Sequence, residues 1–148
     1  MNLQPIFWGG LIAGTLDLVA ACVSAWLRSS VTPIQVAQFI ASGVLGRASF
    51  TGGARTAALG VALHFLIATV AAAVFYFASR KFLGLVERPV TYGLLYGVVV
   101  HLFMTQVIVP LSSVRQQPVT FSGFMIGVLI IMFCVGLPIA LIVRRFSR

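Results

Sequence analysis

Three ionisable residues, Asp17, His64 and His101, stand inside otherwise apolar segments. A carboxylate accepts a proton and an imidazole carries one near neutral pH, so an aspartate beside a histidine can exchange a proton. A lone ionised carboxylate at the centre of a bilayer costs at least about 2.5 kcal/mol. Asp17 therefore needs a proton, a histidine or another hydrogen-bonding partner. These residue types predict a site that binds or relays protons or a small cation.

The spacing around these residues predicts that they point inward at one level. Counted from the helix ends beside the chain termini, Asp17, His101 and His64 lie about 16, 18 and 21 Å deep at 1.5 Å per residue. A competing interpretation makes them structural hydrogen-bonding groups between helices. Steps of three and four residues put Asp17, His64 and His101 each on a helix face of small residues. The three faces are Gly10, Gly14, Asp17, Ala21 and Ser24; Gly60, His64, Ala68 and Ala71; and Gly93, Gly97, His101 and Thr105.

The same side chains are compatible with two other kinds of site. Asp17, His64 and His101 are acceptable zinc or copper ligands, although their spacing is not diagnostic. Two inward-facing histidines on adjacent helices could also hold a haem iron between them. The sequence has no CxxCH haem attachment motif and no nucleophile–base pairing. We therefore expect no enzyme activity and no required cofactor, with haem as the alternative.

Composition identifies the solvent around these segments. The chain has 148 residues, of which 60% are hydrophobic and 8% charged, whereas soluble domains average about 25% charged residues. So few charges cannot cover a surface in water, which predicts the lipid bilayer as the main partner. The net charge of +8 comes from short Lys and Arg clusters between apolar runs. That arrangement is typical of loops beside anionic lipid headgroups and argues against nucleic-acid binding.

The apolar runs have the length of membrane spans. A helix needs about 20 apolar residues to cross the hydrocarbon core, and backbone groups in lipid must be satisfied within the helix. The links after the second and third runs are short, which makes successive helices antiparallel neighbours. We predict one transmembrane domain over residues 1–148, an all-α antiparallel four-helix bundle. Its spans are at about 6–27, 56–78, 89–111 and 121–143.

The longest link, between the first two spans, contains one more helix. Thr32 followed by Pro33 is a helix-start signal, with a cap and then proline at the first helical position. Gln35, Gln38 and Ser42 form one polar stripe along the following residues, opposite apolar ones. The pattern predicts a short interfacial helix at about 33–45, lying on or dipping into the membrane surface.

The positions of Lys and Arg predict the orientation. The face that holds both termini and the second link has six of them, and the other face has four. This bias favours both termini in the cytoplasm of a bacterial inner membrane. The six are Arg80, Lys81, Arg88, Arg144, Arg145 and Arg148, and the four are Arg28, Arg47, Arg55 and Arg115.

Glycines at four-residue spacing predict how the spans pack. Helices in lipid gain little from hydrophobic burial against one another, so small residues that allow close approach supply much of the association. This indicates a tightly packed bundle, or one that also self-associates into a homo-oligomer. Pro138 is expected to kink the fourth span. The GxxxG pairs are Gly10 and Gly14, Gly93 and Gly97, and Gly123 and Gly127, with Gly60 in the same role in the second span.

Three stretches, "GLIAGTLD" in the first span, "ASRK" after the second and "VGLPIALIVRR" at the end, resemble small uncharacterised four-span bacterial inner-membrane proteins. The nearest family is the YagU-like proteins, which are loosely linked to acid tolerance. The resemblance covers size, span pattern and glycine placement over most of the chain. It implies a four-span membrane protein and favours a proton-related role, but it transfers no functional residue.

Two functions of different classes follow from these observations. The first is a small membrane protein whose Asp17, His64 and His101 cluster binds or relays protons or a small cation. The second is a non-catalytic accessory subunit or scaffold of a larger membrane complex, whose GxxxG faces bind partner helices. A bis-histidine haem protein is a further alternative.

Overall fold

The computed structural model describes residues 2–115 and 118–147, and within those ranges the ordered elements are all helical. Met1, Gln116, Gln117 and Arg148 lie outside the described residues, so one of the six charges in the predicted bias is not placed. In chain order the elements are α1 (Gln4–Ser29), α2 (Pro33–Leu45), the 3-10 turn η1 (Gly46–Thr51), α3 (Gly53–Lys81), α4 (Gly84–Glu87), α5 (Pro89–Phe103), the π turn η2 (Met104–Ile108), α6 (Val109–Leu111), α7 (Phe121–Ile131), the π turn η3 (Met132–Gly136) and α8 (Leu137–Phe146).

Four helices are long and apolar enough to cross a membrane: Gln4–Ser29, Gly53–Lys81, Pro89–Leu111 and Phe121–Phe146. The third runs from α5 through η2 to α6, and the fourth from α7 through η3 to α8. Large apolar side chains such as Leu66, Val99 and Phe133 are more than half exposed. An apolar exterior on this scale is unfavourable in water and suits lipid. The predicted all-helical fold with four membrane-length apolar helices is confirmed.

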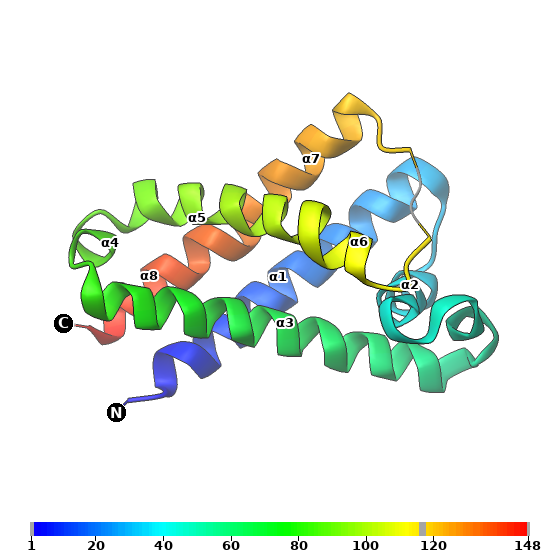
Figure 1. Cartoon of the computed structure of the whole chain (residues 1–148), viewed down its shortest axis with the longest axis horizontal. Helices are drawn as coiled ribbons and strands as arrows, with labels where there is room; N and C mark the ends of the chain where they lie inside the picture. The colour runs from blue at the N-terminus through cyan, green and yellow to red at the C-terminus, as the bar shows by residue number, and fades with distance from the viewer. Residues whose placement is uncertain (1, 116–117, 148) are drawn as a thin grey trace.

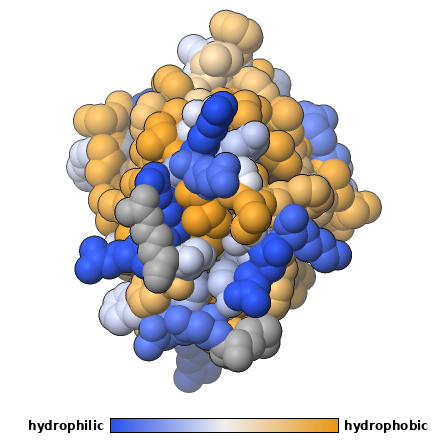
Figure 2. Space-filling view, turned by 90° about the vertical axis from the view of Figure 1, so that its left-hand side faces the viewer, coloured by the Kyte–Doolittle hydropathy of each residue, from blue (hydrophilic) through white to orange (hydrophobic). Residues whose placement is uncertain are grey.

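The arrangement of the helices gives the molecule two distinct ends. In Figure 1 both termini and α4 lie at the left-hand end, and α2 lies at the opposite end. Figure 2 views the left-hand end and shows hydrophilic side chains gathered across it, amid hydrophobic ones. Polar groups at an end and apolar groups along the sides are what a bilayer-spanning bundle requires.

Close packing between helices depends on glycine. A Cβ atom added at Gly10 would lie 2.7 Å from Thr69 Cα, and one at Gly97 would lie 2.5 Å from Met132 Cα. No side chain fits at such distances, so these two glycines let α1 approach α3 and α5 approach the fourth helix. The core between the helices is formed by Ala13, Ala72, Phe75, Tyr76, Val135, Ile139, Ala140 and Val143.

The remaining predicted packing glycines also face neighbouring segments of the same chain. Gly14 meets the Phe65 ring on α3, Gly60 meets the Ala37 carbonyl on α2, and Gly93 meets Gly136 and Ala140 on the fourth helix. Gly123 and Gly127 differ, because the groups nearest to them are the Arg28 guanidinium and the His101 ring. In the fourth helix, close packing against α5 is supplied by Gly136, which the GxxxG pattern does not identify.

Both π turns stand just before a proline. Pro110 follows η2 and Pro138 lies next to the end of η3. A proline lacks the backbone N–H and its ring crowds the carbonyl four residues earlier, here that of Gln106 or Cys134. A widened turn removes that clash without breaking the helix. The structure thus accommodates Pro138 through a π turn.

The helix α2 occupies the same residues as the predicted interfacial helix, but two of the three residues of its polar stripe face inward and only Gln35 is exposed. Thr32 and Gln35 form a capping box at its start. Gln38 and Ser42 are buried, 6% and 3% exposed, whereas Val44 is 64% exposed. The Gln38 amide donates to the Gly53 carbonyl at 3.2 Å. Small residues of α2 thus pack on α3, and its larger apolar residues face outward.

Candidate functional site

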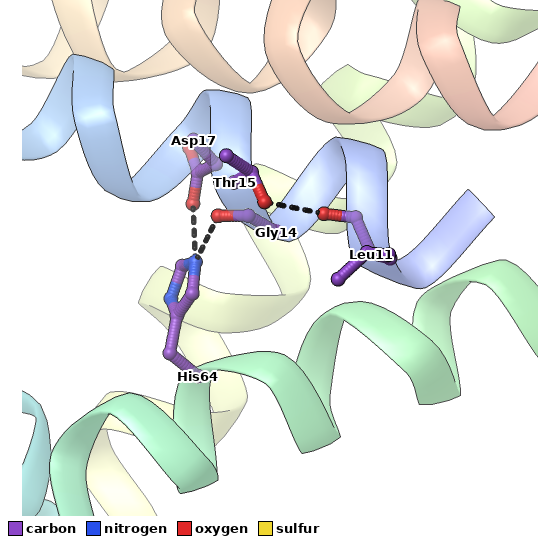
Figure 3. A network of polar contacts seen from close by, with 5 residues as sticks. All are labelled: Leu11, Gly14, Thr15, Asp17 and His64. Carbon is purple, nitrogen blue, oxygen red and sulfur yellow. Dashed lines mark hydrogen bonds and ion pairs between the residues drawn. The ribbon is translucent and has the colours of Figure 1, made fainter. Parts of the chain in front are cut away.

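Asp17 and His64 meet between α1 and α3. The His64 Nε2 atom lies 3.8 Å from Asp17 Oδ2 and 2.9 Å from the Gly14 carbonyl oxygen. Figure 3 shows both contacts, with the imidazole reaching across from α3 to α1. Gly14 makes the approach possible, because a Cβ atom there would lie 2.8 Å from the Phe65 ring. Of the kinds of partner that the sequence leaves open for Asp17, a histidine is therefore present at ion-pair distance.

The Gly14 contact fixes the position of one proton on His64. A carbonyl oxygen only accepts hydrogen bonds, so Nε2 carries the hydrogen and donates it. The 3.8 Å separation from Asp17 exceeds the usual range of 2.7–3.2 Å for a direct N–H···O bond. The two side chains are therefore too far apart for a direct hydrogen bond, and both are mostly buried.

Thr15 is not a partner of Asp17. Its hydroxyl donates to the Leu11 carbonyl at 2.7 Å, within the same helix, as Figure 3 shows. Threonine commonly makes such a bond inside apolar helices, where its hydroxyl has no water to bind. Among the residues that the structure describes, His64 supplies the one ion-pair contact of the Asp17 carboxylate.

Asp17 also lines a cavity of about 400 Å³. It lies along α1, α5 and α7 form its other walls, and it is open to the outside of the molecule. Asp17 and Arg28 are separated along α1 by about 16 Å, at 1.5 Å rise per residue. Aliphatic side chains form most of the remaining wall. The lining residues are Asp17, Ala21, Ser24, Ala25, Arg28, Ser29, Val31, His101, Gly123, Ile126, Gly127, Ile130 and Ile131.

His101 lines this cavity with a side chain that has no hydrogen bond. The residue is 7% exposed, and neither ring nitrogen has a partner among the described residues. Its ring packs edge-on against Phe124 at 4.9 Å and against Gly127, where a Cβ atom would lie 2.7 Å from Cε1. The Thr105 hydroxyl donates to the His101 carbonyl and not to the ring. A buried polar group without a partner costs stability and marks a site that water or a ligand can complete.

The three predicted residues therefore do not meet at one point. Asp17 is near His64 and lines the same cavity as His101, but the two histidines do not share a site. His64 is not among the residues that line the cavity. Within residues 2–115 and 118–147, no group of three His, Cys, Asp or Glu side chains is placed to hold a metal ion. The predicted alternative of a zinc or copper site at Asp17, His64 and His101 has no support in this geometry.

A haem between the two histidines also lacks structural support. The Nε2 atom of His64 is engaged with the Gly14 carbonyl, and His101 is held tightly against Gly127. Iron ligation needs a free imidazole nitrogen on each side of the porphyrin. The two rings here face different surroundings.

Arg28 is a charged residue of the cavity wall, in addition to its place among the basic residues that predict the orientation. It continues the face of Asp17, Ala21 and Ser24 by one further step of four, so helical periodicity places it on the same side of α1. Its guanidinium lies beside Gly123, where a Cβ atom would be 3.0 Å from Nη2. Its role in the cavity does not follow from the sequence, because basic residues at the ends of membrane helices are ordinary interface residues.

The fold and the site define this chain as an all-helical protein with four membrane-length apolar helices and a buried acid–histidine pair beside a cavity. No protein-family model, curated protein or solved structure matches it. The resemblance to YagU-like proteins stays a prediction.

Proposed function

We propose that this protein binds protons at Asp17 from within a membrane and passes them between the cavity and His64. One observation carries the proposal. Asp17 lies 3.8 Å from a histidine and lines a cavity that holds a second, buried histidine with no hydrogen-bond partner among the described residues. A carboxylate and two imidazoles at one depth are groups that exchange protons readily near neutral pH.

The Gly14 contact allows His64 to change its charge without losing its place. An imidazole can gain or lose a proton at one ring nitrogen while the other nitrogen keeps its hydrogen. In both forms Nε2 keeps its hydrogen on the Gly14 carbonyl. Nε2 is the His64 atom nearest to Asp17 and already carries a hydrogen, so the proton exchanged with Asp17 enters or leaves at Nδ1, through bridging water. The hydrogen bond that holds the ring therefore does not have to break when Nδ1 gains or loses a proton.

His101 would exchange protons between Asp17 and water in the cavity once its ring turns, because both ring nitrogens are buried in this structure. A neutral imidazole has one N–H and one lone pair, so it can accept a proton on one nitrogen and release one from the other. Towards the termini-bearing end, the helices are packed with buried apolar residues including Ala13, Phe75 and Ile139. A proton that reaches Asp17 from the cavity leaves by that end only after the helices rearrange, as in alternating access.

The cavity favours protons over metal cations. The permanently charged Arg28 guanidinium lines it, together with a single carboxylate. A metal ion would have to pass this charge and would then find no group of three acidic, histidine or cysteine ligands among the described residues. A proton needs neither, because it moves along hydrogen-bonded water and imidazole groups. We therefore narrow the proposal from protons or a small cation to protons.

We further propose a location and a topology for this function. The four apolar helices would cross a bacterial inner membrane as an antiparallel bundle, with both termini in the cytoplasm and α2 at the opposite surface. Support comes from the bias of Lys and Arg towards the termini-bearing face and from the position of α2 at the other end in Figure 1. The exposed apolar residues of α2 suit a helix that dips into the lipid.

The alternative of an accessory subunit or scaffold is less well supported. It assigns the GxxxG faces to partner helices, whereas Gly10, Gly14, Gly93 and Gly97 all face neighbouring helices of the same chain. A partner or a second copy would have to bind the lipid-facing side chains instead. Co-purification from native membranes distinguishes this alternative, because an accessory subunit should migrate together with its partners.

The test is proton flux into liposomes that contain the purified protein, measured with a trapped pH-sensitive dye under an imposed membrane potential. We expect the wild-type chain to conduct protons and Asp17→Asn to lower the flux about a hundredfold or more, since the amide neither binds nor releases a proton. Thr15→Val is the matched control, because Thr15 lies on the same helix with its hydroxyl bound to its own backbone. Unchanged flux in a folded Asp17→Asn variant contradicts the proposal.

A further inference from the structure

A second cavity, also of about 400 Å³, lies at the α2 end of the molecule. Residues from α2, from η1 and from the loop after α6 form it. Two arginines from different segments, Arg47 on η1 and Arg115 in the loop, reach it together. The full lining is Phe39, Ser42, Gly46, Arg47, Phe50, Ser113 and Arg115.

Contacts between backbone groups hold the loop against α2 at this cavity. The Ser113 N–H donates to the Gly43 carbonyl at 3.0 Å. Gly46 ends α2 with φ of 59°, a conformation that favours glycine, and a Cβ atom there would lie 3.9 Å from Ser113 Cβ. The cavity wall is therefore fixed by the fold and does not depend on the long arginine side chains alone.

The arginines at this end have no acidic partner within the described part of the chain. The sequence contains two acidic residues, of which Asp17 pairs with His64 and Glu87 belongs to α4. Figure 1 places α4 at the opposite end from α2. Both Arg47 and Arg115 are exposed, so their guanidinium groups are free to bind an anion from outside the chain.

The chemistry of the cavity indicates which anion it takes. A guanidinium presents paired N–H donors that match phosphate oxygens. The Ser42 hydroxyl already donates to the Phe39 carbonyl, so it can only accept from a ligand. Phe39 and Phe50 are each 48% exposed and supply apolar surface beside the charged groups. The cavity thus places N–H donors for a phosphate next to exposed aromatic rings, at one end of a membrane bundle. This combination suits a lipid headgroup with its acyl chains alongside.

We propose that this cavity binds the phosphate of an anionic phospholipid. Arg47 and Arg115 hold the phosphate from two sides, and Phe39 and Phe50 contact the first part of the acyl chains. The site would anchor α2 to the lipid surface. It is independent of the proton-binding proposal, because none of its residues contributes to the Asp17 and His101 cavity.

The test is native mass spectrometry of the full chain in detergent, with phosphatidylglycerol or phosphatidylcholine added at equal concentration. We expect the wild-type chain to retain phosphatidylglycerol preferentially, and the Arg47→Gln, Arg115→Gln double variant to retain it roughly tenfold less. Arg144→Gln with Arg145→Gln is the matched control, since it removes the same charge from α8. The control should retain the lipid as the wild type does.

Three results would overturn the proposal. Equal loss of lipid in both double variants would mean that total charge, and not this cavity, sets the binding. Full retention in the Arg47→Gln, Arg115→Gln variant would place the lipid elsewhere. Binding of inorganic phosphate to lipid-free protein, with displacement of phosphatidylglycerol at similar concentrations, would identify a free anion as the ligand.

Discussion

The two buried histidines of this protein have opposite surroundings, although both come from the middle of apolar helices. His64 donates to a backbone carbonyl and lies near a carboxylate. His101 is 7% exposed, and both of its ring nitrogens lack partners among the described residues. The first arrangement is what structural hydrogen bonding between helices requires. The second costs stability as it stands, and water or protons in the adjoining cavity would offset that cost.

This difference separates two roles that residue type alone cannot distinguish. A histidine that is already hydrogen-bonded to a neighbouring helix contributes to packing whether or not it moves protons. A histidine without partners contributes little to packing through its polar atoms. Replacing each residue should therefore affect stability and proton flux in different proportions.

The largest contrast is expected at His101. The variant His101→Phe keeps a ring against Phe124 and removes two unpaired nitrogens, so the free energy of unfolding should stay the same or rise. Proton flux in liposomes should fall by about tenfold or more, because the phenyl ring cannot carry a proton. Flux and reversible unfolding in mixed micelles are measured on the same preparation. A loss of stability with flux intact would reverse the roles assigned to the two histidines.

A smaller effect, chiefly on stability, is expected at His64. His64→Phe removes the hydrogen bond to the Gly14 carbonyl and should lower the free energy of unfolding by about 1 kcal/mol. His64→Gln retains an N–H donor and should recover most of that loss. Unfolding curves of the two variants in the same detergent mixture provide the measurement. Equal stability of the glutamine and phenylalanine variants would show that the Gly14 contact contributes nothing.

The smallest effect is expected from moving the His101 ring without removing it. A Cβ atom at Gly127 would lie 2.7 Å from His101 Cε1, so Gly127→Ala displaces the imidazole and should lower flux about threefold. Gly43→Ala is the matched control, because a Cβ atom there would make ordinary contacts of 3.7 and 3.8 Å. Identical flux in the two alanine variants would mean that the position of His101 does not matter.

Helical periodicity and depth predicted one shared site for Asp17, His64 and His101, and the structure brings Asp17 and His64 together. Both residues lie on small-residue faces at similar levels, and glycine at position 14 lets the helices approach. The same argument could not say which atoms pair. It also could not show that His101 would contact Gly127 and a cavity instead of His64, because that depends on how the fourth helix crosses the bundle.

The sequence pattern could not predict which face of α2 points toward the other helices, and the reason is physical. A polar stripe opposite apolar residues predicts a polar face towards water only when water is the alternative to the protein interior. In α2 the outer face carries large apolar residues such as Val44, and Gln38 and Ser42 of the stripe are buried on the inner face. Gln38 finds the Gly53 carbonyl, and Ala37 packs on Gly60. In a membrane-embedded helix, small and polar residues mark the protein side.

Protonation of Asp17 is the event on which the account of this protein depends. Difference infrared spectroscopy of the chain in lipid bilayers, recorded while the bulk pH is changed, detects the carboxyl group directly. Both spectra are recorded in a Glu87→Gln background, because Glu87 is the other acidic side chain in the sequence. We expect a carboxyl band that appears and disappears with pH when Asp17 is present and is missing when Asp17→Asn is added. A spectrum in which no such band responds to pH although Asp17 is present, or a band that persists when Asp17→Asn is added, would contradict the assignment of Asp17 as the proton-binding residue.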